Sequence, residues 1–331
     1  MTLFIHGVGH FHPENEISNR FLEELDIGTN DQWILDRVGI RSRRTVLPLD
    51  YIRETKNCEP RTAMEAALYS NAELGRRASE IAIARAGIEK SDIGMLISGT
   101  SLMDTTSPAE ACNIGRVMEL EVPAFDVNSA CTSLYVQLYL LSMMQPDKLP
   151  EYVLIVASDS LTKAVDYSDR SAAVLWGDGA AAVVVSTRNP SRARVLGTTM
   201  ESSPAGNDKV IVPRFGHFHQ EGRTVQTFGI KRMTRLLNSA QSRFEEPDRN
   251  LNFVGHQANH RMLESVCKQC NIPPERHFAN VEWYGNTASA GSPSVISMHW
   301  EKWRSNDDVA VVGVGSGLTW SSYLIRFGET P

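Results

Sequence analysis

Apolar segments with the spacing of strands alternate with amphipathic segments with the spacing of helices along this chain. The first half predicts strands at 3–9, 95–101, 124–128, 153–159 and 180–186, and helices at 73–88, at 109–119 and from residue 131 onward. The second half predicts strands at 193–202, 251–254, 309–316 and 321–327, and helices at 229–243, at 257–270 and after residue 286. This alternation, present twice, indicates a parallel sheet layered with helices in each half.

The two halves share features of a duplication. Each opens on a strand that contains glycine, and each closes on a glycine turn followed by an apolar strand, GDGAAAVVV (177–185) and GSGLTWSSYLIRF (315–327). Each also has a chemically reactive side chain at a predicted helix start, Cys131 in one and His256 in the other. A pseudo-twofold axis would bring these two helix ends face to face. We therefore expect two units, residues 1–190 and 191–331.

Composition is that of an ordinary globular protein. The 331 residues are 42% hydrophobic and 22% charged, and the net charge of −6 argues against a general nucleic-acid binder. No apolar run approaches the roughly 20 residues that span a bilayer. The N-terminal segment MTLFIHGVGHFHP has neither a basic leader nor an extended apolar run. We expect a cytoplasmic protein without membrane or nucleic-acid partners.

The five cysteines, at positions 58, 112, 131, 267 and 270, are an odd number scattered over a long chain, which is typical of free thiols in a reducing compartment. Cys267 and Cys270 form a C-x-x-C pair late in a predicted helix. No second pair or paired histidines accompany them to complete a zinc site, and a redox motif would stand at a helix start. We interpret this pair as structural and expect no metal.

Cys131 is the strongest candidate for chemistry. In AFDVNSACTSLYVQLYLL (124–141) an apolar strand turns at a tight corner into a helix whose buried face carries Leu134, Leu138 and Leu141. A thiol there lies near the positive end of the helix, which favours the thiolate. Considered alone, Cys131 is better explained as a buried space-filling residue.

Two later motifs change this balance. VGHQANHRMLESV (254–266) places His256 directly after a short strand, and WYGNTASAGSPS (283–294) places Asn286 in a turn before another helix. Each residue alone has an ordinary structural explanation. Because open α/β sheets bind ligands at the carboxyl ends of their strands, we expect Cys131, His256 and Asn286 to meet in one pocket.

At this point the sequence resembles the β-ketoacyl-ACP synthase III family of the thiolase superfamily, over nearly the whole chain. Six segments match in the family's order: DQWILDRVGIRSRR (31–44), DVNSACTSL (126–134), WGDGAAAVVV (176–185), HQANHR (256–261), YGNTASAGS (284–292) and GVGSGLTW (313–320). The resemblance implies a thiolase-like duplicated α/β fold in α-β-α-β-α layers. It also implies a Cys–His–Asn enzyme that takes an acyl group onto Cys131, and a homodimer, although a mixed dimer with a related chain stays open.

The resemblance assigns further roles. The oxyanion hole would use the backbone amides of Cys131 and Ser316, which stands where the family has a glycine. Trp33 and Arg37 would bind coenzyme A, with the arginines of 41–44 extending the basic patch, and Arg261 would lie near the tunnel mouth. The substrates would be acyl-CoA or acyl-carrier-protein thioesters, with no other cofactor. A plain solvated basic face is the alternative interpretation of this patch.

Asn286 bears on the reaction. A His and a carboxamide stabilise an enolate with N–H groups and add no negative charge, whereas Asp would suit acyl transfer to an alcohol or amine. We therefore expect a decarboxylative Claisen condensation of an acyl thioester with a malonyl or β-ketoacyl thioester, in fatty-acid or specialised metabolism. Acyl transfer to oxygen or nitrogen is the second hypothesis, and a non-catalytic partner subunit the third. Met103 and Cys112, where the family often has a large aromatic residue, suggest a longer or bulkier acyl group.

Overall fold

The computed structural model describes residues 2–329 and contains a nine-stranded sheet. In spatial order its strands are β11 (Asn250–Gly255), β12 (Asp307–Gly315), β13 (Thr319–Phe327), β8 (Ala193–Ser202), β1 (Leu3–Phe11), β7 (Gly179–Ser186), β6 (Tyr152–Asp159), β4 (Ile93–Gly99) and β5 (Ala124–Asp126). Only β4/β5, β4/β6 and β11/β12 are parallel. The expectation of parallel sheets is therefore wrong. The short turn 316–318, for example, cannot supply the crossover that a parallel β12/β13 pair would need.

The strand order repeats between the two halves. The series β1-β7-β6-β4 and β8-β13-β12-β11 each run through two antiparallel pairs and then one parallel pair. β5 extends the first series at the edge, and residues 3–5 of β1 pair with residues 193–195 of β8 to join the two half-sheets. This confirms two related halves. The connection between β7 and β8 contains the expected division at 190/191, which stays a prediction.

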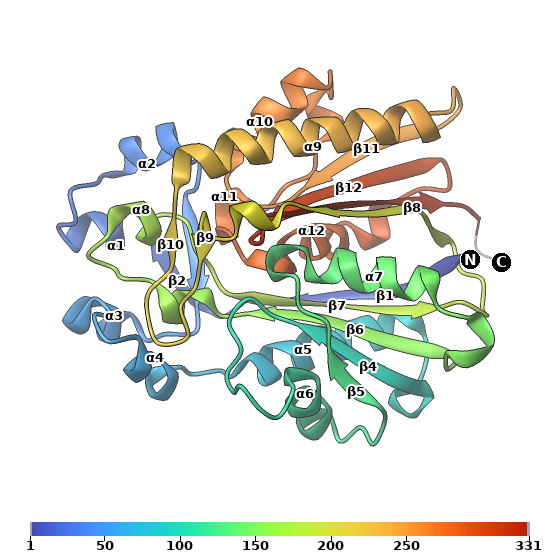
Figure 1. Cartoon of the computed structure of the whole chain (residues 1–331), viewed down its shortest axis with the longest axis horizontal. Coiled ribbons are helices and arrows are strands. Elements are labelled where there is room, and N and C mark those ends of the chain that lie inside the picture. The colour runs from blue at the N-terminus through green and yellow to red at the C-terminus, as the bar shows by residue number, and fades with distance from the viewer. Residues whose placement is uncertain (1, 330–331) are drawn as a thin grey trace.

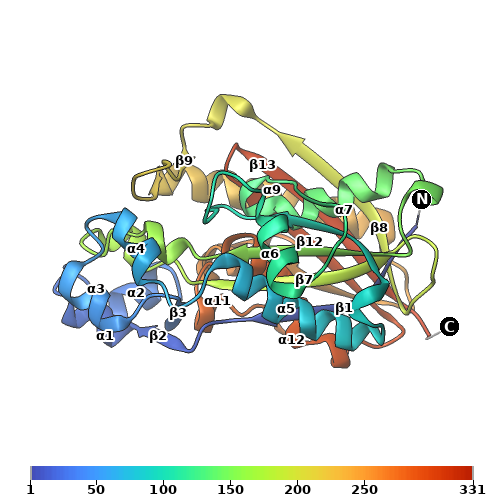
Figure 2. The same ribbon diagram turned by 90° about the horizontal axis from the view of Figure 1, so that it is seen from below.

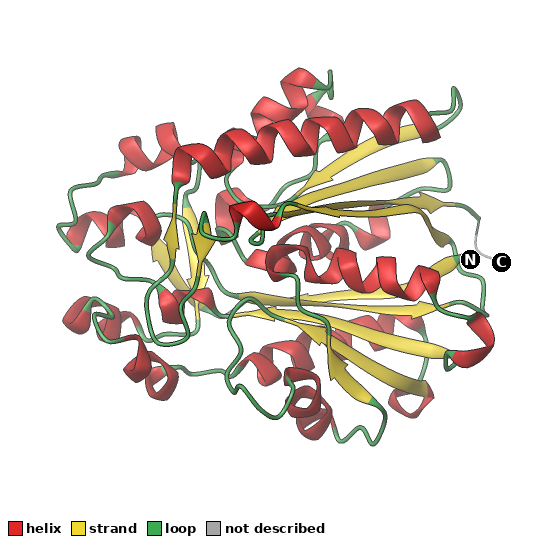
Figure 3. Cartoon of the chain, in the orientation of Figure 1, coloured by secondary structure: helices red, strands yellow, loops and turns green. Residues whose placement is uncertain are grey.

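Helices form three layers around the half-sheets (Figures 1 and 3). α5 (Asn71–Ala86) and α6 (Glu110–Met118) cover the outer face of the first half-sheet, and α9 (Gly222–Phe244), with α10 (His260–Gln269) against it, covers that of the second. α7 (Ser133–Met143) and α12 (Gly291–Met298) lie between the half-sheets. The α-β-α-β-α arrangement is confirmed. Within residues 2–329, none of these helices combines the length and apolarity that a membrane crossing requires.

The central layer is apolar on both sides. Leu134, Leu138 and Leu141 of α7 are buried, as the sequence predicts, in a cluster that includes Ile155 of the first half-sheet and Val311 of the second. The all-round burial explains why this helix lacks a polar face over most of its length. It also fixes the position of the corner that precedes α7.

α5 shows how local sequence sets an element. The Ser70 hydroxyl accepts a hydrogen bond from the Glu73 amide (3.1 Å) at its start, and Gly87 ends it in the left-handed conformation (φ 68°). β1 crosses it so closely that a Cβ on Gly9 would lie 2.0 Å from the Ala78 carbonyl oxygen. The glycine of the first strand therefore permits close packing of a helix on the sheet.

Several short elements, absent from the sequence prediction, gather beyond one end of the sheet (Figures 1 and 2). They are β2 (Asn15–Ser18), α1 (Asn19–Glu24), α2 (Asp31–Arg37), β3 (Ser42–Thr45), α3 (Leu49–Thr55), α4 (Pro60–Ala66), α8 (Arg170–Ala173), β9 (Val210–Ile211) and β10 (His219–Gln220). Most span only one or two helical turns or a few strand residues, too short for a periodic hydrophobic pattern. α2 is nevertheless well defined, because the Asn30 side chain accepts a hydrogen bond from the Trp33 amide (2.9 Å).

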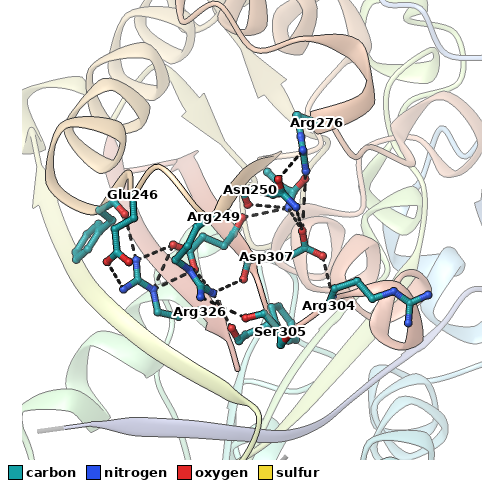
Figure 4. A network of polar contacts seen from close by, with 12 residues as sticks. Glu246, Arg249, Asn250, Arg276, Arg304, Ser305, Asp307 and Arg326 are labelled. Carbon is teal, nitrogen blue, oxygen red and sulfur yellow. Dashed lines mark hydrogen bonds and ion pairs between the residues drawn. The ribbon is translucent and has the colours of Figure 1, made fainter. Parts of the chain in front are cut away.

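An ion-pair network closes the opposite end of β12 (Figure 4). Asp308, nearly fully buried, accepts hydrogen bonds from the guanidinium groups of Arg249 and Arg326, with closest N···O distances of 2.8 Å to both. Arg326 also pairs with Glu246 at the surface. Such a buried carboxylate is tolerated because each oxygen has a charged partner. The network is structural, because it lies at the start of β12, whereas the turn at 316–318 follows the end of that strand.

Candidate active site

The corner that carries Cys131 is a short 3-10 turn, Ala130–Thr132, between β5 and α7. α7 itself begins at Ser133, so the expectation that the helix runs from Cys131 is corrected by two residues. Ala130 takes a left-handed conformation (φ 48°), and its amide donates to the Asn128 Oδ1 (2.8 Å). A non-glycine residue held in this region signals local strain that the surroundings enforce. The thiol is thereby held at the wall of a cavity.

Asn286 stands on a matching corner in the second half. Ala288 is also left-handed (φ 46°), and its amide donates to the Asn286 Oδ1 (3.0 Å) before α12 begins. The counterpart of the Cys131 corner is therefore the Asn286 corner, not the His256 helix, which corrects the expectation from sequence. Because its oxygen is occupied, the Asn286 side chain presents its NH₂ group for donation.

His256 follows β11 directly and is 4% exposed. Its amide donates to the Val312 carbonyl (2.9 Å), which fixes the backbone to β12. Burial lowers the pKa of the imidazole to about 4, so the ring is neutral at physiological pH. Its Nδ1 is buried and has no hydrogen-bond partner among residues 2–329. A neutral imidazole can accept a proton at one nitrogen and donate from the other.

Cys131, His256 and Asn286 line one cavity of about 360 Å³. The three side chains come from three different corners, and the structure brings them together as the sequence predicts. The remaining wall is largely apolar, and it includes Trp176, Phe228 and Leu318. A mostly apolar cavity with a few polar groups is typical of a small-molecule site.

The ionisation of Cys131 differs from the expectation. Burial raises the pKa of the thiol to about 12, and the nearby Asp159 carboxylate adds to this rise. The Ser101 hydroxyl lies near the sulfur and lowers the pKa without making a full hydrogen bond to any described residue. The helix end that favours the thiolate is therefore outweighed by burial, and the site holds a neutral thiol beside a neutral imidazole.

Asp159 was not predicted as part of this cluster. Its carboxylate accepts hydrogen bonds from the Ser101 amide (2.5 Å), the Thr100 hydroxyl (3.1 Å) and the amide of Ser289 (3.1 Å), and it also pairs with the Ser289 hydroxyl. It thus ties the loop behind Cys131 to the corner of the second half. The sequence makes Asp159, like Glu110, a conceivable acid/base helper but does not place either residue in the cleft.

Ser316 also lines the cavity, in the turn after β12. Its hydroxyl donates to the carbonyl of Val210 (2.6 Å), another residue of the cavity wall. The preceding Gly315 crosses the Cys131 corner closely, since a Cβ there would lie 3.2 Å from the Thr132 amide nitrogen. The position suits the oxyanion role suggested for Ser316, and that role stays a prediction.

Trp33 and Arg37 line the same cavity from α2. The Arg37 guanidinium lies 5.6 Å from the Trp33 ring centroid, and that of Arg170 lies 4.8 Å from it. Sequence reasoning missed Arg170, because a lone arginine far from the other motifs carries no signal. Two cations beside an indole ring form a surface for planar, anionic ligands.

The other predicted basic residues lie elsewhere. Arg43 is fully buried and donates to the Val174 carbonyl, while Arg41 pairs with Glu282 and Arg44 with Glu16. None of the three lines the cavity, so the expected extension of the basic patch is wrong. Arg261 lies in a neighbouring open depression that shares Arg37 and Gln226 with the cavity.

Comparisons with known proteins agree with this geometry. Residues 125–204 match the family model for 3-oxoacyl-[acyl-carrier-protein (ACP)] synthase III, and residues 247–327 match the model for its C-terminal part. The chain is 30% identical to β-ketoacyl-[acyl-carrier-protein] synthase III of Staphylococcus saprophyticus, over 99% of this chain and 100% of the relative, and 28% identical to that of Campylobacter curvus, over 97% and 96%.

Solved structures give the same result. The 3-oxoacyl-[acyl-carrier-protein] synthase III of Aquifex aeolicus superposes with a TM-score of 0.86 at 26% identity, covering 98% of this chain and 100% of the other. That of Pseudomonas aeruginosa superposes with a TM-score of 0.85 at 27% identity, covering both chains fully. Fold, cavity and sequence agree: the chain belongs to the β-ketoacyl-[acyl-carrier-protein] synthase III family of condensing acyltransferases in the thiolase superfamily.

Proposed function

We propose that this protein joins an acyl group to a malonyl thioester by decarboxylative Claisen condensation, through an acyl intermediate on Cys131. The observation that carries the proposal is the convergence of a thiol, an imidazole and a carboxamide on one cavity. Membership in the synthase III family supports the same reaction.

In the first half-reaction, the Cys131 sulfur attacks the carbonyl carbon of an acyl thioester and its proton passes to His256. The neutral imidazole is ready to accept this proton, since its pKa of about 4 keeps it unprotonated before attack. The tetrahedral oxyanion is held by the amides of Cys131 and Ser316. The proton then leaves with the thiolate of the carrier, and an acyl group remains on Cys131.

In the second half-reaction, the acceptor thioester loses carbon dioxide and forms an enolate. Asn286 donates an N–H to the enolate oxygen, and His256 donates a second. The Asn286 oxygen is already bonded to the Ala288 amide, so the correct face of the carboxamide is held toward the cavity. The enolate carbon attacks the acyl carbon, the bond from that carbon to the Cys131 sulfur breaks, and the released thiolate takes a proton from water.

Coenzyme A or a phosphopantetheine arm enters along Trp33. The guanidinium groups of Arg37 and Arg170 near the ring suit the phosphates and planar base of a nucleotide carrier. Arg261 and Lys268 in the neighbouring depression offer further cations to an acidic carrier protein. Each step is a proton transfer, an addition, a decarboxylation or a departure of thiolate, so the proposed reaction needs no metal or redox cofactor.

We also propose a homodimer in the cytoplasm. Family resemblance supports the dimer, and the short edge strand β5 offers unpaired backbone groups to a second copy. The five cysteines are unpaired, as in proteins of reducing compartments. Light scattering of the purified protein would show twice the chain mass, and a monomer would contradict the dimer.

Intact-protein mass spectrometry tests the proposed reaction. The protein is incubated with acetyl-CoA, and a mass increase of one acetyl group is expected on the wild type and not on Cys131→Ala. Malonyl-ACP is then added, and the acetyl mass should disappear with release of carbon dioxide and a β-ketoacyl product. Transfer to an alcohol or amine without carbon dioxide, or failure of every acyl donor to label Cys131, would refute the proposal.

A further inference from the structure

A second, larger cavity lies beside the first. It has a volume of about 670 Å³ and is formed by residues 101–107 after β4, the start of α4, and residues 212–216 after β9. The two cavities share no lining residue, but they are adjacent at two places. Ser101 lines the second cavity while its hydroxyl faces the Cys131 sulfur, and Val210 and Val212, two residues apart, line the first and the second.

This space is adjacent to the Cys131 sulfur through Ser101, and neither Trp33 nor Arg37 lines it. Trp33 and Arg37 lie in the first cavity with the thiol, and Ser101 marks the boundary with the second. A thioester carbonyl at Cys131 can extend its carrier arm into one cavity and its acyl chain into the other. Met103, which the sequence singled out for acyl selection, lines the second cavity, whereas Cys112 lines neither.

The second cavity is apolar near Ser101 and cationic further out. Leu102, Ala164 and Val212 provide apolar wall. Phe215, 64% exposed, lies with Arg61 and Arg214 close to its ring, at 5.0 and 5.4 Å from the ring centroid. Cation–π attraction holds both guanidinium groups beside this exposed ring, at the outer part of the cavity.

The charge of this cavity is unbalanced. Lys163, 2% exposed, pairs with Asp104, and no other acid lines the wall. Arg61 has only a distant partner, Glu59 at 4.0 Å, and Arg214 donates to the neutral Thr106 hydroxyl (3.0 Å). Three cations thus face one anion, in a chain whose net charge is −6. A local positive potential in an acidic protein favours an anionic ligand.

This imbalance distinguishes between two kinds of acyl group. A plain alkyl chain long enough to reach Phe215 would displace water from the guanidinium groups without forming a hydrogen bond or ion pair in its place. A chain that ends in a carboxylate would pair with a planar guanidinium through two hydrogen bonds. The apolar stretch near Ser101 would then hold the methylenes between the thioester and the carboxylate.

We propose that the second cavity binds the acyl group of the donor, and that this acyl group ends in a carboxylate recognised by Arg61 and Arg214. The proposal rests on the proposed function. The donor is then a dicarboxylic monothioester: its bond to the carrier sulfur breaks, a bond to the Cys131 sulfur forms, and the thiol proton passes through His256 to the departing carrier thiolate. The distal carboxylate takes no part in the chemistry and sets specificity.

Matched pairs of donors test this inference. Rates of Cys131 acylation are measured by intact-protein mass spectrometry with succinyl-, glutaryl-, adipyl- and suberyl-CoA, each against the unsubstituted acyl-CoA of equal length. At the best length the dicarboxylic donor should be favoured by about tenfold or more, as one good ion pair predicts. Equal rates, or faster reaction of the unsubstituted donors at every length, would overturn the inference.

Two variants separate recognition from general effects. Arg61→Gln combined with Arg214→Gln should bring the ratio of dicarboxylic to unsubstituted rates close to one. Arg223→Gln, which changes an arginine of the first cavity, should slow both members of each pair equally and preserve the ratio. A preference that survives the double variant would also overturn the inference. If none of the acyl donors labels the wild type, the proposed function itself fails, whereas labelling without the preference for dicarboxylic donors refutes only the inference.

Discussion

The ionisation of Cys131 gives the sharpest test of the site. Burial and Asp159 raise the pKa of the thiol to about 12, against an ordinary value of about 8.5, so the thiolate fraction at pH 7 falls by roughly three orders of magnitude. A more basic thiolate is also a stronger nucleophile. With a Brønsted slope of about 0.45, this pKa difference raises the rate constant of the thiolate roughly 30- to 40-fold. The thiolate fraction dominates, and we expect alkylation at pH 7 to be slowed by roughly two orders of magnitude or somewhat less.

The assay is modification by iodoacetamide, followed residue by residue with peptide mass spectrometry. Because the thiolate is the disfavoured form, the logarithm of the Cys131 rate should rise with pH at a slope near one from pH 7 to about pH 10, without a plateau. Free cysteine in the same tubes provides the reference for the reagent. The measurement is made on the free enzyme, since a bound carrier would change the burial of the sulfur.

His256→Ala distinguishes this state from a thiolate–imidazolium pair. With a neutral imidazole, whose pKa of about 4 lies far below the assay range, removal of the ring should change the alkylation rate by less than about threefold, while acyl transfer is lost. An ion pair would instead give a plateau below pH 8 in the wild type and a collapse of that plateau in the variant. Such a plateau would refute the reasoning from burial.

Three further outcomes follow from the structure. Asn286→Asp should lower condensation at least about 100-fold, as loss of an oxyanion donor does, while acylation of Cys131 measured by mass changes by less than about threefold. Trp33→Ala should raise KM for acyl-CoA about tenfold with little effect on kcat, whereas Trp283→Ala, at an exposed tryptophan outside the cavity, should change neither. Asp308→Ala removes the buried carboxylate that Arg249 and Arg326 share and should lower the free energy of unfolding by about 3–5 kcal/mol in urea titrations, against less than about 1 kcal/mol for Glu246→Gln at the exposed end of the same network.

Buried strands such as β6 and β7 were predictable because they appear in the sequence as apolar runs. β8 begins and ends where the sequence predicts, and β6 and β7 differ by one residue. The direction of the strands was not predictable, because it depends on which strands become neighbours after the chain has folded. The short elements between residues 12 and 72 were equally hard to predict from the sequence, because helix caps and contacts with distant segments stabilise them.

The basic segment 37–44 shows a similar limit within the site. Arg37 and Arg43 are equivalent in the sequence, yet one lines the cavity and the other is buried against the Val174 carbonyl. Arg43 lies in β3, which pairs with the distant strand β2, and its side chain is fully buried there. Arg170 approaches Trp33 only through tertiary packing. Local motifs therefore predicted the three side chains that meet in the cavity and Arg37 beside them, whereas the positions of the other arginines depend on the fold.

Duplication explains how two different groups reach one cavity. The side chains of Asn128 and Asn286 each accept a hydrogen bond from the amide two residues later. In both corners that amide belongs to a left-handed alanine, Ala130 in the first and Ala288 in the second. The two 3-10 turns that follow lie in contact between the half-sheets. In the first corner the residue after the alanine is Cys131, whose thiol meets the cavity. In the second it is Ser289, which turns to Asp159.

The same equivalence explains why Asp, and not Ala, is the informative replacement for Asn286. The Oδ1 of Asn286 holds the corner by accepting from the Ala288 amide, while the Nδ2 serves the cavity. Aspartate keeps the acceptor for the Ala288 amide and replaces the N–H donor with a negatively charged oxygen, whereas alanine removes both groups and releases the strained turn. Loss of condensation in the aspartate variant, with acylation retained, therefore reports on the cavity-facing side of the carboxamide and not on the corner. Loss of both activities would instead mean that the corner, and not the amide donor, is what the reaction requires.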